Sequence, residues 1–206
     1  MMKKVVCSIV ALILLIMTPV YAKENIELDR INDLYMGQSH NDMDLENLVN
    51  SENIVFDSNF DKDIFLNDNN SAVAIGLIEL EDGQEQIRSF NNESLKSYAI
   101  AKASVTAGLW SGSFLHLNYD VYASSSVLMS STCRVELYTT NGKFIKGFNM
   151  AASSSSATDH LSVTHSIGGL ENYNKVKVVI KDAFALSNNG KTYPLPIRIS
   201  SFIASR

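Results

Sequence analysis

From about residue 97 onward, apolar and polar residues alternate along the chain with a period of two. In SFLHLNYDVYA (113–123), the apolar residues Leu115, Leu117, Tyr119 and Val121 fall on one face of an extended strand, and polar residues fall on the other. Similar stretches recur, each bounded by Ser, Gly or Asn clusters. The pattern predicts strands at 97–106, 113–123, 132–139, 143–150, 160–167, 175–182 and 193–203.

Seven strands at intervals of 10–18 residues, with no long helical pattern, predict an all-β fold. We expect an antiparallel β-sandwich, either immunoglobulin- or fibronectin-like or of the jelly-roll type. Asn141-Gly142 predicts a two-residue hairpin turn, because both central residues of such a turn need positive φ. Pro194 and Pro196 cannot donate ladder hydrogen bonds, so the last strand should lie at an edge or enter the sheet after Pro196. Two serine runs are expected to be loops: 124–126 and 153–156.

One short stretch also supports a sandwich. GGLENYNKVKVVI (168–180) resembles the fibronectin type III segment in which a leucine precedes a tyrosine and alternating valines. The resemblance covers thirteen residues and implies a sandwich fold only.

The preceding residues have a different composition. Residues 23–71 are rich in Asn, Asp, Glu and Ser with scattered apolar positions, which predicts an acidic segment that is flexible or forms short helices. Residues 72–94 are expected to be a hairpin or linker, with Asp82-Gly83 as its turn. A short helix over 72–80 is the competing interpretation.

The N-terminus is typical of a secretory signal peptide, residues 1–22. Lys3 and Lys4 precede an apolar run (5–17) that is too short to cross a bilayer, and Pro19 breaks any helix before the small residues of the cleavage site. We therefore expect a secreted bacterial protein, extracellular or loosely associated with the cell wall. No transmembrane segment is expected after cleavage.

Charge divides the chain into two regions of opposite sign. Residues 23–94 carry 17 acidic and 4 basic side chains, a net charge of −13, whereas residues 95–206 carry 5 acidic and 11 basic side chains, a net charge of +6. The domain at 95–206 should therefore be a basic β-sandwich. Its charge could attract an external anionic partner or dock the chain's own acidic segment.

The best candidates for binding an anionic partner are basic residues near the strand at 175–182. Lys175, Lys177 and Lys181 share one face of that strand, and Lys143, Lys146 and Arg198 could extend the stripe. The simpler interpretation is that these lysines keep the outer face of a sheet soluble. The expected partner is an anionic cell-envelope polymer or an extracellular protein. Nucleic acid is disfavoured, since the chain is exported and lacks interleaved aromatic and basic residues.

A weak calcium candidate lies in DSNFDKDIFLND (57–68). Asp57, Asn59 and Asp61 match the first ligand positions of an EF-hand loop, and Asp68 stands at position 12. Position 6 is Lys62, where glycine normally permits the turn, and position 12 is normally a glutamate. A run this rich in Asn and Asp produces such partial matches readily, so no specific metal site and no cofactor is predicted.

Two single residues are expected in the core. Cys133 alternates with Val135 and Leu137, which is typical of a small buried residue. Cleavage of the signal peptide would remove Cys7, so no internal disulfide is expected. Trp110 is the only tryptophan and is expected to anchor the core.

Catalytic motifs are absent from the sequence: it contains no GxSxG, HExxH or phosphate-binding glycine loop. His160 and His165 should point to opposite faces of one strand, which argues against a shared metal. His116 and Asp120 share a face but lie ~13 Å apart on an extended strand, too far to pair. The leading hypothesis is therefore a non-enzymatic binding module. The alternatives are a toxin or antimicrobial β domain masked by an acidic pro-segment, and a hydrolase with a site assembled across strands.

Overall fold

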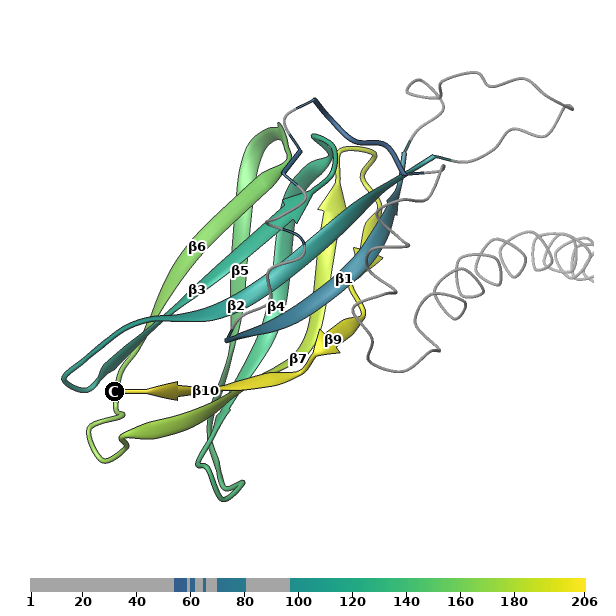
Figure 1. Cartoon of the computed structure of the whole chain (residues 1–206). Coiled ribbons are helices and arrows are strands. Elements are labelled where there is room, and N and C mark those ends of the chain that lie inside the picture. Colours follow the sequence, from purple (N-terminus) through teal and green to yellow (C-terminus); the bar gives the residue numbers. More distant parts are fainter. Residues whose placement is uncertain (1–53, 59, 62–64, 66–69, 81–96) are drawn as a thin grey trace, which may run out of the picture. The chain divides into compact units, whose positions relative to one another are not determined.

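The computed structural model describes residues 54–58, 60, 61, 65, 70–80 and 97–206 (Figure 1). The predicted signal peptide lies outside these residues. All described residues belong to one of the chain's two compact units. They form ten strands: β1 (Ser71–Glu79), β2 (Tyr98–Ser111), β3 (Phe114–Ala123), β4 (Leu128–Tyr138), β5 (Phe144–Thr158), β6 (His160–Ile167), β7 (Lys175–Ser187), β8 (Thr192–Pro194), β9 (Ile197–Ile199) and β10 (Ser201–Ser205).

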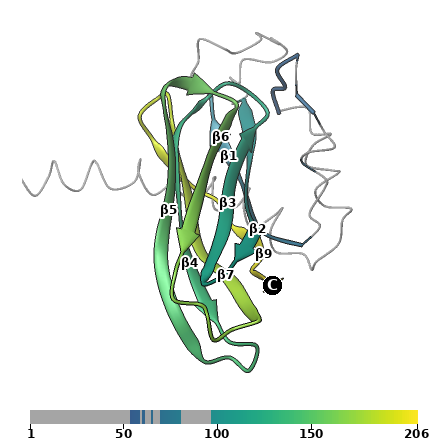
Figure 2. The same cartoon turned by 90° about the vertical axis from the view of Figure 1, so that its left-hand side faces the viewer.

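The strands form two antiparallel sheets that pack face to face (Figure 2). The first sheet has the order β6-β3-β2-β1-β9, and the second has the order β10-β7-β4-β5, with β8 also paired to β7. The chain crosses to the second sheet between β3 and β4 and returns between β5 and β6. One hydrophobic cluster, drawn from both sheets, fills the space between them. The predicted antiparallel β-sandwich is confirmed.

Alternation places the core residues as the sequence predicts. Along β3, Leu115, Leu117, Tyr119 and Val121 are each 0% exposed and contribute to the core. Apolar burial of this kind, at roughly 25 cal/mol per Å², is the main favourable contribution to folding. Cys133 is buried among these residues, as expected.

The sandwich begins earlier in the chain than the sequence analysis placed it. Residues 71–79 are β1, which lies inside the first sheet between β2 and β9, so the competing helix over 72–80 is wrong. The strand is almost continuously apolar because both of its faces are buried. Residues 81–96, including the predicted Asp82-Gly83 turn, lie outside the described residues.

The hairpin between β4 and β5 is confirmed, but its predicted two-residue turn is wrong. The Thr139 amide donates to the Lys143 carbonyl (2.8 Å), and the Gly142 amide donates to the Thr139 carbonyl (3.0 Å). These bonds enclose three residues, of which Gly142 has a φ of 88° and Asn141 does not have positive φ. A type I turn followed by one left-handed glycine fits this loop, so a single positive φ is sufficient.

The single strand predicted at 193–203 is wrong, because this segment forms three short strands, but the strand that follows Pro196 does lie at a sheet edge as predicted. β8 pairs with β7, β9 then joins β1 at the edge of the first sheet, and β10 returns to the edge of the second. Between the prolines, the Leu195 amide still donates to the Ala183 carbonyl of β7 (2.8 Å). The Pro196 carbonyl accepts from the Ile75 amide of β1 (2.8 Å). The chain therefore changes sheets at Pro194–Pro196, where strand hydrogen bonding from proline is impossible.

The two serine runs differ. Residues 124–126 form the connection from β3 to β4, as expected. Residues 153–156 lie within β5, so their prediction as a loop is wrong. On either side of the run, Leu128 of β4 pairs with Thr158 of β5, and Ser130 pairs with Ser153. One residue of β4, Met129, therefore lies opposite four residues of β5, 154–157. The run is therefore a large bulge in an edge strand, where extra residues are tolerated.

Candidate functional site

The six predicted basic residues do not form one stripe. Lys175, Lys177 and Lys181 are exposed on the outer face of β7. Lys146 lies on β5 and donates to the Gly168 carbonyl at 3.4 Å, and Arg198 lies on β9 in the other sheet. Arg198 therefore does not extend the stripe, because strand register, not sequence spacing, decides which side chains share a surface.

A β-bulge sets the direction of Lys181. Ile180 pairs with Val135 and Asp182 pairs with Arg134, which leaves Lys181 without an opposite residue. Lys181 and Asp182 are consequently both exposed, although neighbouring residues in a regular strand point to opposite faces.

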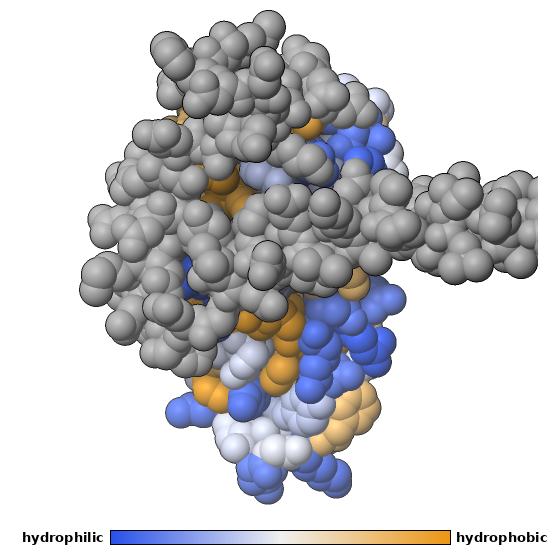
Figure 3. Space-filling model, turned by 90° about the vertical axis from the view of Figure 1, so that its right-hand side faces the viewer, coloured by the Kyte–Doolittle hydropathy of each residue, from blue (hydrophilic) through white to orange (hydrophobic). Residues whose placement is uncertain are grey.

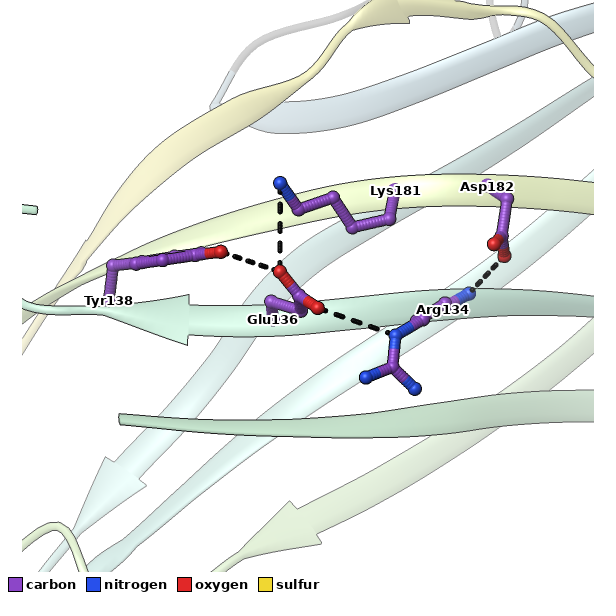
Figure 4. Close-up of polar contacts among 5 residues, drawn as sticks. All are labelled: Arg134, Glu136, Tyr138, Lys181 and Asp182. Atoms are coloured by element: carbon purple, nitrogen blue, oxygen red, sulfur yellow. Dashed lines mark hydrogen bonds and ion pairs between the residues drawn. The ribbon is translucent and has the colours of Figure 1, made fainter. Parts of the chain in front are cut away.

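Lys181 belongs to a polar network centred on Glu136 (Figure 4). The Tyr138 hydroxyl donates to Glu136 Oε2 (2.6 Å), Lys181 Nζ lies 3.6 Å from the same oxygen, and Arg134 Nε lies 3.4 Å from Oε1. The Tyr138 hydrogen bond, followed by the nearby Lys181 and Arg134 charges, lowers the pKa of Glu136. The same hydrogen bond raises the pKa of Tyr138. The charge of Lys181 is therefore largely balanced within the protein.

A larger basic cluster lies at one end of the sandwich. Strands β2, β4 and β6 end there, β3, β5 and β7 begin there, and β10 ends opposite Lys175 (Figure 1). We call this region, with its loops 111–113, 139–143 and 168–174, the basic end. Glu171 is the one acidic side chain that these described loops contribute. The basic side chains of this end, its strand ends included, are Lys143, Lys146, Lys175, Lys177 and Arg206. Glu136 and Lys181, which pair with each other, lie next along β4 and β7.

The opposite end of the sandwich carries acidic residues. Asp57 contacts the β3–β4 connection, Glu79 ends β1, and Asp159 lies between β5 and β6, whereas Lys191 is the basic side chain of the loop after β7 at this end. Charge is therefore separated along the sandwich. Among the described residues, the excess positive charge predicted for residues 95–206 is therefore found mainly at one end of the sandwich.

Two large apolar side chains are exposed beside the basic charges. Leu109 is 70% exposed and Phe114 is 51% exposed, and both lie next to the β2–β3 turn. Ala107 pairs with Leu117 and Trp110 pairs with Leu115, so residues 108 and 109 together oppose one residue of β3. This bulge directs Leu109 outward and Trp110 into the core, where it is 8% exposed. A glycine within a strand is the sequence signal that would have suggested the bulge.

Apolar surface is not confined to that turn. Phe144, at the start of β5, is 52% exposed and makes an edge contact with Tyr138 (5.6 Å between ring centroids). In the face shown in Figure 3, apolar and hydrophilic surface lie side by side below the residues drawn in grey.

Asp57, the first residue of the calcium candidate, has a structural role. Its Oδ2 accepts hydrogen bonds from the Ser126 amide (2.9 Å) and the Ser126 hydroxyl (3.1 Å). Asn59 and Asp68 lie outside the described residues, and Asp61 is exposed. The described residues contain no group of three His, Cys, Asp or Glu side chains that could hold a metal.

Residues 54–65 of the acidic segment, where described, contact the outer face of the first sheet. The Val55 amide donates to the Tyr98 carbonyl (2.9 Å), and the Ser124 hydroxyl donates to the Val55 carbonyl (2.7 Å). Lys102, only 2% exposed, donates to the Phe65 carbonyl (2.7 Å). The described part of this segment therefore lies against β2 and the β3–β4 connection, away from the lysines of β7. Buried apolar residues on this outer face include Val73, Ile75, Leu77, Tyr98 and Ile100.

The histidines form separate pairs on the first sheet. His160 stacks on Tyr122 (4.1 Å between centroids), with its Nε2 3.5 Å from Asp120 Oδ1. His116 Nδ1 and the Ser166 hydroxyl lie 2.8 Å apart. His165 instead stacks on Phe148 of β5, so His160 and His165 point to opposite faces as predicted. The described contacts give one Asp–His pair and one Ser–His pair, and they do not join the two pairs.

The sequence matches no protein-family profile and no curated protein. A solved structure of IrmA from Escherichia coli is 18% identical over 44% of this chain and 78% of that chain, with a TM-score of 0.31. An X-ray structure of the structural genomics target SoR45 is 11% identical over 68% of this chain and 89% of that chain, with a TM-score of 0.30. Among the described residues, no helix is long and apolar enough to cross a membrane.

Proposed function

We propose that the protein is a secreted, non-enzymatic binding module whose basic end contacts an anionic partner in the cell envelope or extracellular space. The proposal combines the predicted signal peptide with the separation of charge along the sandwich. A basic surface attracts anionic partners over roughly one Debye length, ~8 Å at physiological ionic strength.

The observation that carries the proposal is the exposure of Lys175 and Lys177. Both lie on the outer face of β7 at the basic end. No acidic side chain among the described residues pairs with either of them, whereas Lys181 lies 3.6 Å from Glu136. Unpaired surface lysines can neutralise an anionic ligand without first breaking an internal ion pair.

The test is retention of the protein on immobilised inorganic polyphosphate, followed by elution with a salt gradient. We expect Lys177→Gln to elute at lower salt than the wild type. Lys191→Gln is the matched control, because Lys191 is exposed in the loop after β7, at the other end. Failure of the wild type to be retained at low salt, or equal effects of the lysine changes at both ends, would contradict the proposal.

The pro-segment alternative needs a shorter pro-segment than the sequence suggested. Removal of residues 23–94 would remove β1, which pairs with both β2 and β9. The mature domain of such a toxin would therefore have to retain residues from about Ser71 onward. An intact N-terminal region in the secreted protein would count against this alternative.

The hydrolase alternative has one specific starting point, the Ser166–His116 contact of 2.8 Å on the outer face of the first sheet. Assays with esterase and glycosidase substrates test it. Activity lost in Ser166→Ala and kept in Ser162→Ala, a neighbouring exposed serine on the same strand, would favour this alternative.

A further inference from the structure

The turn between β2 and β3 presents two apolar side chains in a fixed position. Leu109 and Phe114 flank the turn and are mostly exposed. Single exposed apolar residues are common, but two bulky ones at a protruding turn, beside concentrated basic charge, form a distinct surface. Both residues are directed outward by strand register, since Leu109 lies in the bulge and Phe114 pairs with Ser111.

Contacts with two other segments hold this turn in place. The Leu170 amide donates to the Ser113 carbonyl (3.2 Å), and the Arg206 guanidinium donates to the Gly112 carbonyl. Arg206 also lies over the ring of Trp110, 5.8 Å from its centroid. A turn fixed in this way loses little conformational entropy when its side chains become buried against a partner.

Two basic side chains, Arg206 and Lys146, lie near the apolar pair, and Lys175 lies at the same end on the second sheet. Arg206 contacts the turn directly, and its amide donates to the Asn174 carbonyl (3.0 Å). Lys146 donates to the carbonyl of Gly168, a residue that lies against the Phe114 ring. Lys175 pairs with Ser205, the residue before Arg206. Long basic side chains can keep their charges at a polar boundary while neighbouring apolar groups lie deeper.

We propose that the basic end binds the surface of a bilayer containing anionic phospholipid, with Leu109 and Phe114 inserted at the level of the headgroups. This inference rests on the proposed function, because it uses the same basic end and names its anionic partner. A soluble polyanion would satisfy the lysines but would leave both apolar side chains in water. A lipid surface satisfies both, since apolar insertion and attraction to anionic headgroups act together in interfacial binding.

Trp110 provides a local readout, because it is the only tryptophan and lies beside Leu109. The protein recovered from an exporting host is mixed with vesicles of phosphatidylcholine and phosphatidylglycerol that carry bromine on their acyl chains. Bromine quenches tryptophan only at short range, so attachment through another part of the chain would leave Trp110 emission unchanged. We expect quenching with mixed vesicles and much less with phosphatidylcholine alone.

Two sets of variants separate the apolar and basic contributions. We expect Phe114→Ser to weaken vesicle binding by about tenfold, as the loss of a buried aromatic side chain predicts. The control Phe184→Ser removes an aromatic residue that is 40% exposed on β7 and should bind as the wild type does. Lys175→Gln should weaken binding about fivefold, in line with the contribution of one basic residue near an anionic bilayer.

The outcomes distinguish the two proposals. Retention on polyphosphate without quenching by vesicles would overturn the lipid inference and leave the proposed function standing. Equal quenching by both vesicle types, or equal effects of Phe114→Ser and Phe184→Ser, would also overturn the lipid inference. Absence of both retention and quenching would overturn both proposals.

Discussion

A buried hydrogen-bond relay joins the two sheets across the core, and it gives a quantitative test of the structure. The Tyr119 and Ser131 hydroxyl oxygens lie 2.6 Å apart, and the Ser131 hydroxyl donates to the Phe184 carbonyl (2.7 Å). Because Ser131 has a single hydroxyl hydrogen, Tyr119 must be the donor in their contact. Tyr119 is 0% exposed and Ser131 is 1% exposed, so water cannot replace either partner from outside. Burial is the main cause that raises the pKa of Tyr119.

Ser131→Ala should cost about 1–3 kcal/mol, because it removes the oxygen that accepts from the buried Tyr119 hydroxyl and leaves that hydroxyl only the Cys133 sulfur, a weak acceptor. The removed oxygen vacates less than the roughly 30 Å³ that a water molecule occupies in the liquid, so a bound water should not rescue the site. Tyr119→Phe should cost less, about 0.5–1.5 kcal/mol, since Ser131 keeps its bond to Phe184. In the double variant the stranded hydroxyl is absent, so the two costs should fail to add by about 1 kcal/mol.

Urea unfolding followed by Trp110 emission measures each free energy of unfolding. Ser130→Ala is the matched control, because Ser130 is the half-buried neighbour on β4, and it should change stability by less than about 0.5 kcal/mol. Equal costs for the two serine variants would refute the relay. Strict additivity of Tyr119→Phe and Ser131→Ala would refute the inter-sheet bond itself.

Three further predictions concern the core, the β1 strand and the Asp57 contact. Burial, followed by the nearby Asp182 charge, raises the pKa of the Cys133 thiol from 9.0 to about 12. The unfolded thiol therefore ionises first, and the urea midpoint should fall as the pH rises from 9 to about 12, with a smaller fall in Cys133→Ala. Gly76→Ala should destabilise the fold by about 1–3 kcal/mol, since its Cβ would lie 2.7 Å from a backbone oxygen, whereas Gly108→Ala meets nothing closer than 3.4 Å; equal urea midpoints would contradict this. Asp57→Ala should increase proteolytic cleavage between residues 54 and 70, because two hydrogen bonds to Ser126 are lost, and an unchanged digest would show that the contact does not hold the segment.

The strand pattern predicted most of the fold because burial between two sheets imposes a strict period of two. It predicted the outward and inward residues of β3, the opposite orientations of His160 and His165, and the edge position of the strand that follows Pro196. These features depend on local spacing alone. The hairpin predicted at 72–94 placed a strand near β1, but the sequence did not place that strand inside the sandwich, since a strand buried on both faces has no alternation that shows which sheet it joins.

The candidate site was harder to predict, because it depends on which strands become neighbours. Lys146 and Arg198 were grouped with the lysines of β7, yet Arg198 lies in the other sheet. The pairing of Lys181 with Glu136 joins β7 to β4, strands separated by the whole of β5 and β6 in sequence. No spacing within one strand contains that information. The exposed Leu109 and the contact of Arg206 with the β2–β3 turn were missed for the same reason.

Two bulges interrupt the alternation of inward and outward side chains, and each changes which residues are exposed on the surface. In a regular β2 strand, the side chain of Leu109 would point into the core and that of Trp110 would point outward. The extra residue of the bulge reverses these two directions, so the larger side chain is buried and the smaller one is exposed. In β7, the extra residue places Lys181 beside Asp182 on the outer face, within reach of Glu136. One bulge thus gives the basic end its apolar turn, while the other draws a lysine into an internal network. The lysines of β7 whose charges stay unpaired are therefore Lys175 and Lys177. Both lie between the Lys181 bulge and the end of the sandwich that carries the β2–β3 turn. A partner that recognises this protein by charge would meet the apolar turn at the same end.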